Sequence, residues 1–430
     1  FAGSGIAIGY AGPGVLLSYA LAALIALAMV LSLSEMAVAH PSAGSIGTYA
    51  EIYLGPFAGF AARATYWFAQ VVAIAGEATA AGLYMRYWIP EVPLWSWTLG
   101  FAVVLVWVNT LAVQRFGSVE YWLTLVKVSA IVAFIVLGGT QLLGLHGESP
   151  GLGNLTGLEG GFLPHGLHGV WMATLVATFS FIGIEVIAVT SGEARDPARA
   201  IPTALRGMAL RLLLFYVLAL GIMLALVPWT ELGKHGVTGS PFVTVFASYG
   251  LGWAAGFMNF VVLSAALSSM NTNLYLTSRM LFSLSRAGYA PAALGRLGSP
   301  GTPGLAAWTT GACIIAASCV SWFTPLAYNY LFGIALFGGI VIWMLVLASH
   351  LRFRTRHRGR ALPLRTRFFP VPQYLGLALL FALLLTMGLD TAFWNVSWIV
   401  GVPWLALLAI AWLTVLRHRA PEAGRAAAEA

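Results

Sequence analysis

Long apolar runs, separated by short polar connections, make up most of this chain of 430 residues. A helix needs about 20 apolar residues to cross a bilayer, and most runs reach that length. The pattern predicts spanning helices at about Val15–Ala39, Phe57–Tyr84, Trp95–Val113, Tyr121–Leu143, Gly169–Ser191, Gly207–Trp229, Gly250–Leu276, Leu305–Phe323, Leu326–Leu351, Val371–Leu389 and Val396–Leu416. The connections His40–Pro56 and Gly144–His168 contain no spanning run and are predicted to be loops.

The opening segment, Phe1–Tyr10, is too short to cross a bilayer by itself. We interpret it as the outer remainder of a first helix whose start is not in this chain, which brings the expected total to twelve. The pattern predicts an all-α polytopic membrane protein with one transmembrane domain over residues 1–416. Helices one to five fall at about residues 1–143, helices six to ten at about 169–351, and the last two at about 371–416. Polar residues 417–430 are predicted to be a disordered cytoplasmic tail.

Composition supports a membrane protein and argues against an enzyme. The chain is 60% hydrophobic and 8% charged, whereas soluble domains carry about 25% charged residues. Its two cysteines, Cys313 and Cys319, lie in one apolar run without the spacing of a metal site. The sequence contains no phosphate-binding loop, HExxH or nucleophile-elbow motif. We therefore expect no catalytic activity, no cofactor and no metal.

The distribution of basic residues predicts how the helices are oriented. If the connection after Val15–Ala39 is cytoplasmic, 19 of the 22 lysines and arginines lie on the cytoplasmic side. This bias follows the positive-inside rule and predicts cytoplasmic termini at a plasma membrane, such as the bacterial inner membrane. It also explains the net charge of +8 without a nucleic-acid partner. The Arg352–Arg367 connection either contacts anionic lipid headgroups or acts only as a topology signal.

One stretch within the sixth predicted helix is unusual for a membrane segment. It reads FSFIGIE and combines a glycine, Gly183, with a carboxylate, Glu185. Glycine weakens a helix, and a charge facing acyl chains is unfavourable by on the order of a few kcal/mol. In one interpretation the helix opens here and its freed carbonyls bind a positively charged group. In the other, Gly183 packs against a neighbouring helix and a protonated Glu185 is hydrogen-bonded in the core.

Further ionisable residues lie within or near predicted spans. Lys127, the only lysine in a span, either extends to the cytoplasmic interface or stays buried and exchanges a proton during a working cycle. Glu77, among small residues that suit close helix contact, is either a functional carboxylate or a neutral cap on a neighbour's polar group. Glu35 and Glu193 lie near predicted cytoplasmic helix ends, where hydration is easy, and we expect them to have gating or structural roles.

A polar stripe runs along the end of the eighth predicted helix, in SAALSSMNTNLY. Its members are Ser264, Ser268, Ser269, Asn271 and Asn273. Ser268 and Asn271 are three residues apart and therefore share one face of a helix. Such a stripe either lines a pathway or holds helices together, and the sequence does not decide between these roles.

Several ordered motifs resemble those of one transporter family. They include SEMAVAHPSAGSIGTYA, GEATAAGLYMRYW, VKVSAIVAF, FSFIGIE and SGEARDPARAIPTALR. With AGPG, YLGPFAGF, GGFLPHG and SRMLFSLSRAGYAP, the likeness extends from Gly3 to about Arg367. The chain resembles the amino acid permeases of the amino acid–polyamine–organocation superfamily, close to their bacterial amino acid transporter branch.

The resemblance implies a fold and a substrate site. The fold would be LeuT-like, a five-plus-five inverted repeat with two further helices and with the first and sixth helices broken at mid-membrane. An amino acid would bind between the breaks, its ammonium facing backbone carbonyls of the sixth helix. The residues of this segment that match the substrate site are Phe179, Ser180, Phe181, Ile182, Gly183 and Glu185. The acid of the SGEA motif matches Glu193.

The resemblance also implies how transport would be driven. Lys127 would lie where some relatives hold a sodium ion, which favours proton coupling. Glu77, which is nominated from its position within a predicted span and not from the resemblance, would assist. The family's first-helix break precedes Gly3, Ser4 and Gly5, so these residues are candidates only for the edge of the substrate site. We predict import of an amino acid by proton symport with alternating access. The alternatives are an amino acid or amine exchanger and a sodium-coupled symporter, whereas a channel or membrane enzyme lacks support because the chain has no pore-ring repeat or catalytic constellation.

Overall fold

The computed structural model describes residues 2–40, 45–111, 116–145, 151–185, 197–234, 240–250, 252–298, 302–360, 362–390 and 394–418. Within these ranges every regular element is helical. Eight of the described helices are long and apolar enough to cross a membrane, and Leu94–Asn109, Gly166–Phe181 and Leu214–Leu226 are shorter apolar helices. The protein is therefore a polytopic, all-α membrane protein, as its hydrophobic pattern predicts.

The major helices follow the predicted runs, except that the sixth, predicted over Gly169–Ser191, ends at Phe181 where the backbone turns at Ile182 and Gly183. They are α2 (Val15–Ala39), α4 (Pro56–Met85), α5 (Leu94–Leu111), α6 (Phe116–Leu142), α8 (Gly166–Phe181), α10 (Pro197–Leu226), α13 (Gly252–Arg286), α14 (Gly304–Ser318), α16 (Ala327–Arg356), α17 (Val371–Leu389) and α18 (Val396–Thr414). The shorter α-helices are α1 (Ala2–Ala11), α3 (Ser45–Leu54), α7 (Gly153–Thr156), α11 (Trp229–Lys234), α12 (Pro241–Ser248) and α15 (Val320–Phe323). Helix α10 begins ten residues before the predicted start, and α13 extends ten residues beyond Leu276, because amphipathic helical turns continue past the apolar runs.

The prediction of a loop at His40–Pro56 is wrong, since this connection contains α3. Its buried hydrophobic residues, Ile46, Tyr49, Ala50 and Tyr53, recur at the spacing of one helix face. Glu51 also connects α3 to the bundle, since it accepts hydrogen bonds from Arg63 at 2.7 Å and from the hydroxyl of Tyr289 at 2.9 Å. Helix α3 is therefore an amphipathic helix packed on the bundle, too short to span it.

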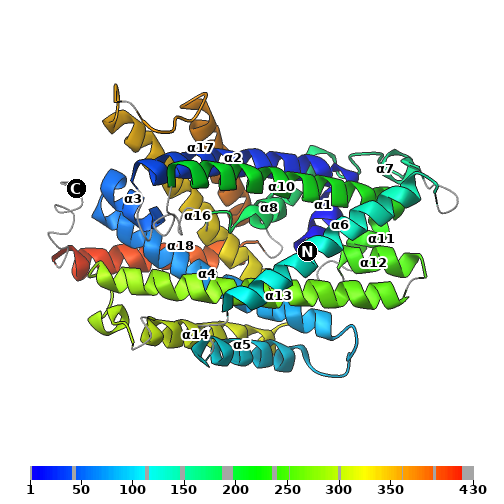
Figure 1. Cartoon of the computed structure of the whole chain (residues 1–430), viewed down its shortest axis with the longest axis horizontal. Helices are drawn as coiled ribbons and strands as arrows, with labels where there is room; N and C mark the ends of the chain where they lie inside the picture. The colour runs from blue at the N-terminus through cyan, green and yellow to red at the C-terminus, as the bar shows by residue number, and fades with distance from the viewer. Residues whose placement is uncertain are drawn as a thin grey trace.

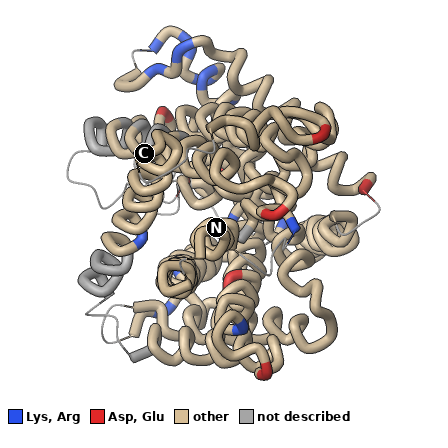
Figure 2. The backbone as a smooth tube through the Cα atoms, turned by 90° about the vertical axis from the view of Figure 1, so that its right-hand side faces the viewer, with Lys and Arg blue, Asp and Glu red and all other residues tan. Residues whose placement is uncertain are grey.

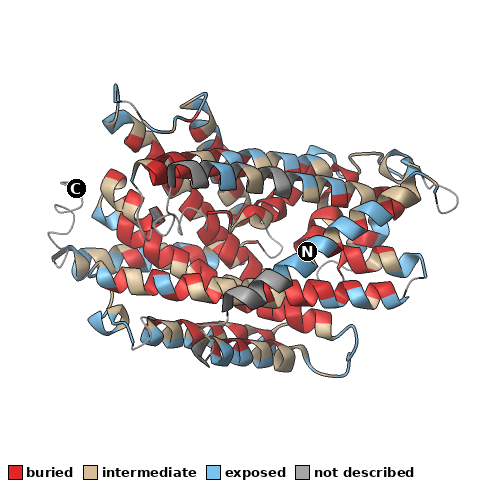
Figure 3. Ribbon diagram, viewed as in Figure 1, coloured by how far each residue is buried: buried red, intermediate tan, exposed pale blue. Residues whose placement is uncertain are grey.

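The helices form a bundle around α4, α8, α13 and α16 (Figure 1). Helix α4 packs on α13 and α16, α2 packs on α8 and α10, and α5 and α14 lie together along one outer side. Figure 3 shows buried residues concentrated in the interior helices, while the outer helices expose many of theirs. Close approach depends on small residues, since a Cβ at Gly338 of α16 would lie 2.5 Å from the Cβ of Ala69 on α4.

Charged residues are sparse in the bundle and gather at its periphery. Figure 2 shows several lysines and arginines together at one outer end of the bundle. The sequence stretch Arg352–Arg367 is rich in arginine, begins within the last turns of α16 and continues past its end at Arg356. Of the predicted tail, residues 419–430 lie outside the described residues.

Candidate functional site

Helix α8 ends at Phe181, in the interior of the bundle. The next residue, Ile182, is extended (φ −63°, ψ 136°), and Gly183 has a φ of +107°, which side chains other than glycine rarely adopt. A Cβ at position 183 would meet no atom within 4 Å, so the glycine is required by its backbone angle and not by packing. Opposite, Gly339 of α16 provides room for the side chain of Ile182, which a Cβ there would overlap.

Hydrogen bonds hold this interruption of the helix in place. The amide of Gly183 donates to a carboxylate oxygen of Glu185 at 3.0 Å, so the buried Glu185 folds back onto its own turn. The carbonyl of Phe179 accepts from the amide of Ile182 at 3.0 Å, and that of Ser180 accepts from the hydroxyl of Tyr216 at 3.1 Å. Within the described residues the carbonyl of Ile182 accepts no hydrogen bond. Because a carbonyl oxygen has two lone pairs, all three can still accept from a bound cation.

The interruption opens onto a cavity of about 400 Å³ in the middle of the bundle. Helices α4, α6, α10, α13 and α16 supply the other walls. Their lining residues are Tyr66, Ala69, Gln70, Ala73, Glu77, Lys127, Met208, Leu212, Ser269, Thr272, Asn273, Ala335, Gly339, Ile342 and Trp343. From the α8 segment, Phe179, Ser180, Ile182, Gly183, Ile184 and Glu185 contribute. The cavity combines an apolar wall with a few polar groups, as small-molecule sites do.

Glu77 and Lys127 both line this cavity. One carboxylate oxygen of Glu77 accepts a hydrogen bond of 2.6 Å from the hydroxyl of Ser269. The ammonium of Lys127 donates one of 2.7 Å to the hydroxyl of Ser268. Two consecutive serines of α13 thus contact an acid from α4 and a base from α6. This geometry brings Lys127 toward the bundle interior and does not match the interpretation in which it extends to the cytoplasmic interface.

The polar stripe on α13 has both of the roles that the sequence left open. Ser269 and Asn273 line the cavity, and the amide of Asn273 lies 3.5 Å from each carboxylate oxygen of Glu77. Asn271 points to another helix and accepts a hydrogen bond of 2.6 Å from Asn109 of α5. The stripe therefore lines the cavity on one side and connects α13 to α5 on the other.

Several predicted site residues lie away from the cavity. Phe181 is buried against Tyr19 and Tyr216, with ring centroids 6.4 and 5.6 Å away. Gly3, Ser4 and Gly5 are buried in α1 and are not among the residues that line the cavity. Ser4 borders a separate cavity of about 120 Å³. Glu193 lies outside the described residues.

Glu35 is also remote from the cavity, and the expectation that it is easily hydrated is wrong. Its side chain is fully buried at the end of α2. One carboxylate oxygen accepts a hydrogen bond of 2.7 Å from the amide of Thr366 and lies 3.1 Å from Nε2 of His350. The other lies 3.2 Å from Nε of Arg354. Glu35 therefore ties the end of α2 to α16 and to the segment before α17.

Other lining residues were missed by the sequence interpretation. Tyr66, Gln70 and Ala73 precede Glu77 by eleven, seven and four residues, so all four share one face of α4. Following that face back from Glu77 would have found them. Trp343 of α16 carries no comparable signal, since an aromatic residue in an apolar run is more often core than site. Within the described residues, no three His, Cys, Asp or Glu side chains are grouped as metal ligands would be.

Comparisons with known proteins identify the family of this chain. The family model for amino acid permeases matches residues 1–423. The chain belongs to the amino acid permease family. Among its relatives is an uncharacterized amino acid permease, YtnA, of Bacillus subtilis, which is 39% identical over 420 residues, covering 95% of this chain and 89% of the relative.

Two further relatives have more specific names. The aromatic amino acid transport protein AroP of Escherichia coli K12 is 36% identical over 423 residues, covering 96% of this chain and 90% of AroP. The gamma-aminobutyric acid permease of Bacillus subtilis is 36% identical over 395 residues, covering 90% and 83%. This permease is accordingly an amino acid transporter and not an enzyme.

Proposed function

We propose that this permease imports an amino acid across the plasma membrane by proton symport, in an alternating-access cycle. The observation that carries the proposal is the pairing of Glu77 and Lys127 with consecutive serines of α13 at one cavity. An acid and a base inside a membrane protein, both facing the same cavity, form a route on which a proton can be held and released. Both termini are predicted to be cytoplasmic, so import would carry the substrate to the side of the membrane on which the termini lie.

The substrate would bind against the interruption after α8. Its ammonium would face the carbonyl oxygens of Phe179, Ser180 and Ile182, of which the last accepts no hydrogen bond within the described residues. Backbone carbonyls at an interrupted helix are established ligands for cations in transporters. The predicted LeuT-like inverted repeat of twelve helices belongs to this proposal, because it would place a second interruption opposite the first.

The cavity also favours a class of side chain. Tyr66, Phe179 and Trp343 contribute aromatic surface, and the volume of about 400 Å³ is at the small end of the range of about 300–1,000 Å³ for ligand sites. We infer an amino acid with an apolar or aromatic side chain, in line with the name of the relative AroP. The name of the gamma-aminobutyric acid permease keeps amino acids whose ammonium is not on the α-carbon among the candidates.

Uptake into proteoliposomes that contain the purified permease tests the proposal. The twenty amino acids and gamma-aminobutyric acid are supplied one at a time, with and without an inward proton gradient and with sodium present or absent. We expect saturable uptake of a small set, accumulated only with the proton gradient and unaffected by sodium. Accumulation that requires sodium would contradict proton symport. Exchange of labelled substrate without net accumulation would instead identify an exchanger.

A further inference from the structure

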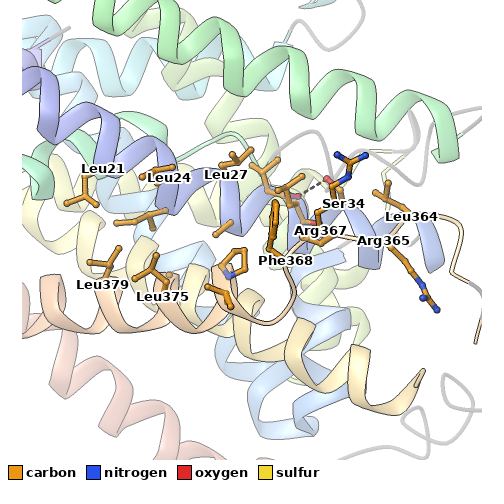
Figure 4. Close-up of a pocket in the computed structure, with 18 residues that line it drawn as sticks. Leu21, Leu24, Leu27, Ser34, Leu364, Arg365, Arg367, Phe368, Leu375 and Leu379 are labelled. Carbon is orange, nitrogen blue, oxygen red and sulfur yellow. Dashed lines mark hydrogen bonds between the residues drawn. The ribbon is translucent and has the colours of Figure 1, made fainter. Parts of the chain in front are cut away.

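A groove of about 590 Å³ lies between α2 and α17, on the outside of the bundle. It shares no lining residue with the central cavity. Leucines of both helices form its walls, among them Leu24 and Leu375, which are 60% and 54% exposed. Arg365 and Arg367 line its other end, and Figure 4 shows them at the opposite end of the groove from Leu21 and Leu379.

The floor of the groove is made by small residues. A Cβ at Gly376 of α17 would lie 3.6 Å from the Cβ of Ala28 on α2 and 3.0 Å from the side chain of Leu347. The helices are also fixed to each other by a hydrogen bond of 3.0 Å from the amide of Gln373 to the hydroxyl of Ser32. The depression is thus a fixed feature of the helix packing.

At the arginine end of the groove, Thr366 lies between the two arginines, and its backbone hydrogen bonds fix the position of this segment. The amide of Thr366 donates to Glu35 at 2.7 Å, and its carbonyl accepts from Arg354 at 3.2 Å. With Thr366 buried in this way, the flanking Arg365 and Arg367 are exposed. One guanidinium nitrogen of Arg365 donates to the carbonyl of Arg360 at 2.7 Å, and a guanidinium has five N–H donors, so further donors are available.

The dimensions match one leaflet of a bilayer. Along α2 the groove extends from Leu21 to Ser34, about 20 Å at 1.5 Å per residue. Half of a hydrocarbon core of about 30 Å is about 15 Å, which leaves the arginines at headgroup level. An apolar slot that ends in two exposed guanidinium groups is complementary to an acyl chain that ends in a phosphate.

We propose that this groove is a binding site for an anionic phospholipid, with one acyl chain along α2 and α17 and the phosphate at Arg365 and Arg367. A neutral lipid would use the apolar wall alone, and a free phosphate would use the arginines alone. The two parts together select an amphiphile with a negative headgroup. The site is independent of the proposed substrate and of its coupling ion.

The test uses the whole permease in detergent, with phosphatidylglycerol or phosphatidylcholine added, and measures bound lipid by native mass spectrometry. Phosphatidylglycerol should be retained in preference to phosphatidylcholine. Removal of both arginine charges, Arg365→Gln with Arg367→Gln, should weaken its binding by about fivefold per arginine, thus about 25-fold. The matched control, Arg358→Gln with Arg360→Gln, removes the same charge from the same connection outside the groove and should leave binding unchanged.

The same measurement is made with two phosphate compounds that have no acyl chain. Glycerol phosphate and inorganic phosphate at the same concentration should bind far more weakly than the lipid. Tight binding of either would show an anion site without a lipid requirement and would overturn the proposal. Equal loss in the two glutamine variants, or equal binding of the two lipids, would do the same. If the Arg365→Gln, Arg367→Gln protein does not fold, Arg365→Lys with Arg367→Lys keeps the charges and should retain phosphatidylglycerol preferentially.

Discussion

The ammonium of Lys127 on α6 lies 2.7 Å from the hydroxyl oxygen of Ser268 on α13. The neighbouring residue, Ser269, contacts Glu77 of α4. Glu77 and Lys127, two of the ionisable residues that line the cavity, are therefore linked through one short piece of one helix. A change in the position of α13 would alter both contacts together, which would connect the proposed proton exchange with the proposed opening of the bundle.

Replacement of Lys127 by alanine should remove proton-driven accumulation. Without the amine the cavity loses a group that can take up and release a proton, whereas the carbonyls of the α8 interruption remain. Exchange of labelled substrate across the membrane should therefore persist after accumulation is lost. The measurement is uptake into proteoliposomes with and without an inward proton gradient.

The control for this variant is Lys234→Ala, which removes the other lysine, in α11, and should leave accumulation intact. Undiminished accumulation by the Lys127→Ala protein would contradict the proposed role. If that protein fails to fold while Lys234→Ala folds, the contact of Lys127 with Ser268 is structural.

Replacement of Gly183 by alanine should weaken substrate binding. The φ of +107° disfavours any side chain by roughly 1–3 kcal/mol, although the Cβ itself meets no atom within 4 Å. We expect affinity to fall by about tenfold or more, measured by binding of labelled substrate to the purified protein. Gly221→Ala, in the interior of α10 with equally open space and no positive φ, should leave affinity unchanged. Equal effects of the two substitutions would refute the importance of the backbone angle.

Replacement of Glu35 by glutamine should destabilise the protein without a direct effect on the cavity. Arg354 and His350 would then lose the buried carboxylate that they face, a loss of about 3–5 kcal/mol when one partner of a buried ion pair is removed. Thermal unfolding in detergent should show a clearly lower midpoint. Glu159→Gln, at an exposed position, should change stability by no more than about 0.5 kcal/mol.

A double variant checks the cause of this destabilisation. If the unpaired guanidinium is responsible, Arg354→Gln added to Glu35→Gln should recover part of the lost stability. Additive losses would mean that the hydrogen bond from Thr366 to Glu35 matters more than the charge pair.

The orientation of the permease can be tested by thiol labelling. Thr355, at the exposed end of α16, should be cytoplasmic, and Glu91, between α4 and α5, should face the opposite side. Cysteines at these positions, one at a time, are placed in a protein whose half-buried Cys313 and Cys319 have been replaced by alanine. In intact cells a membrane-impermeant reagent should label position 91 and not 355. The reverse pattern would invert the proposed direction of transport.

The sequence predicted the helices well where length and apolarity were enough. The bounds Val15–Ala39 and Val371–Leu389 agree with α2 and α17 at both ends. It missed α3, because its ten residues are shorter than any membrane span and its signal is a one-sided pattern.

The candidate site was predicted in part, because charged residues are conspicuous inside apolar runs. Glu77 and Lys127, predicted for proton coupling, and Glu185, predicted for substrate binding, all line one cavity. The partners could not be foreseen. Thr366 lies 331 residues from Glu35 in the sequence, and only the folded chain shows that its amide donates to the buried carboxylate. Tyr216, which donates to the carbonyl of Ser180, looks in the sequence like any aromatic residue of a membrane helix.

The contacts made by two consecutive serines on α13 also limit which insertions and deletions this stretch of the gene can tolerate. Ser268 and Ser269 reach different helices because neighbouring residues on a helix point about 100° apart. A codon inserted between them would rotate the rest of α13 by that angle and leave Lys127 and Glu77 without one shared support. We expect the stretch from Ser264 to Asn273 to vary between species by substitution alone, while changes of length collect in surface connections such as the one between α6 and α8.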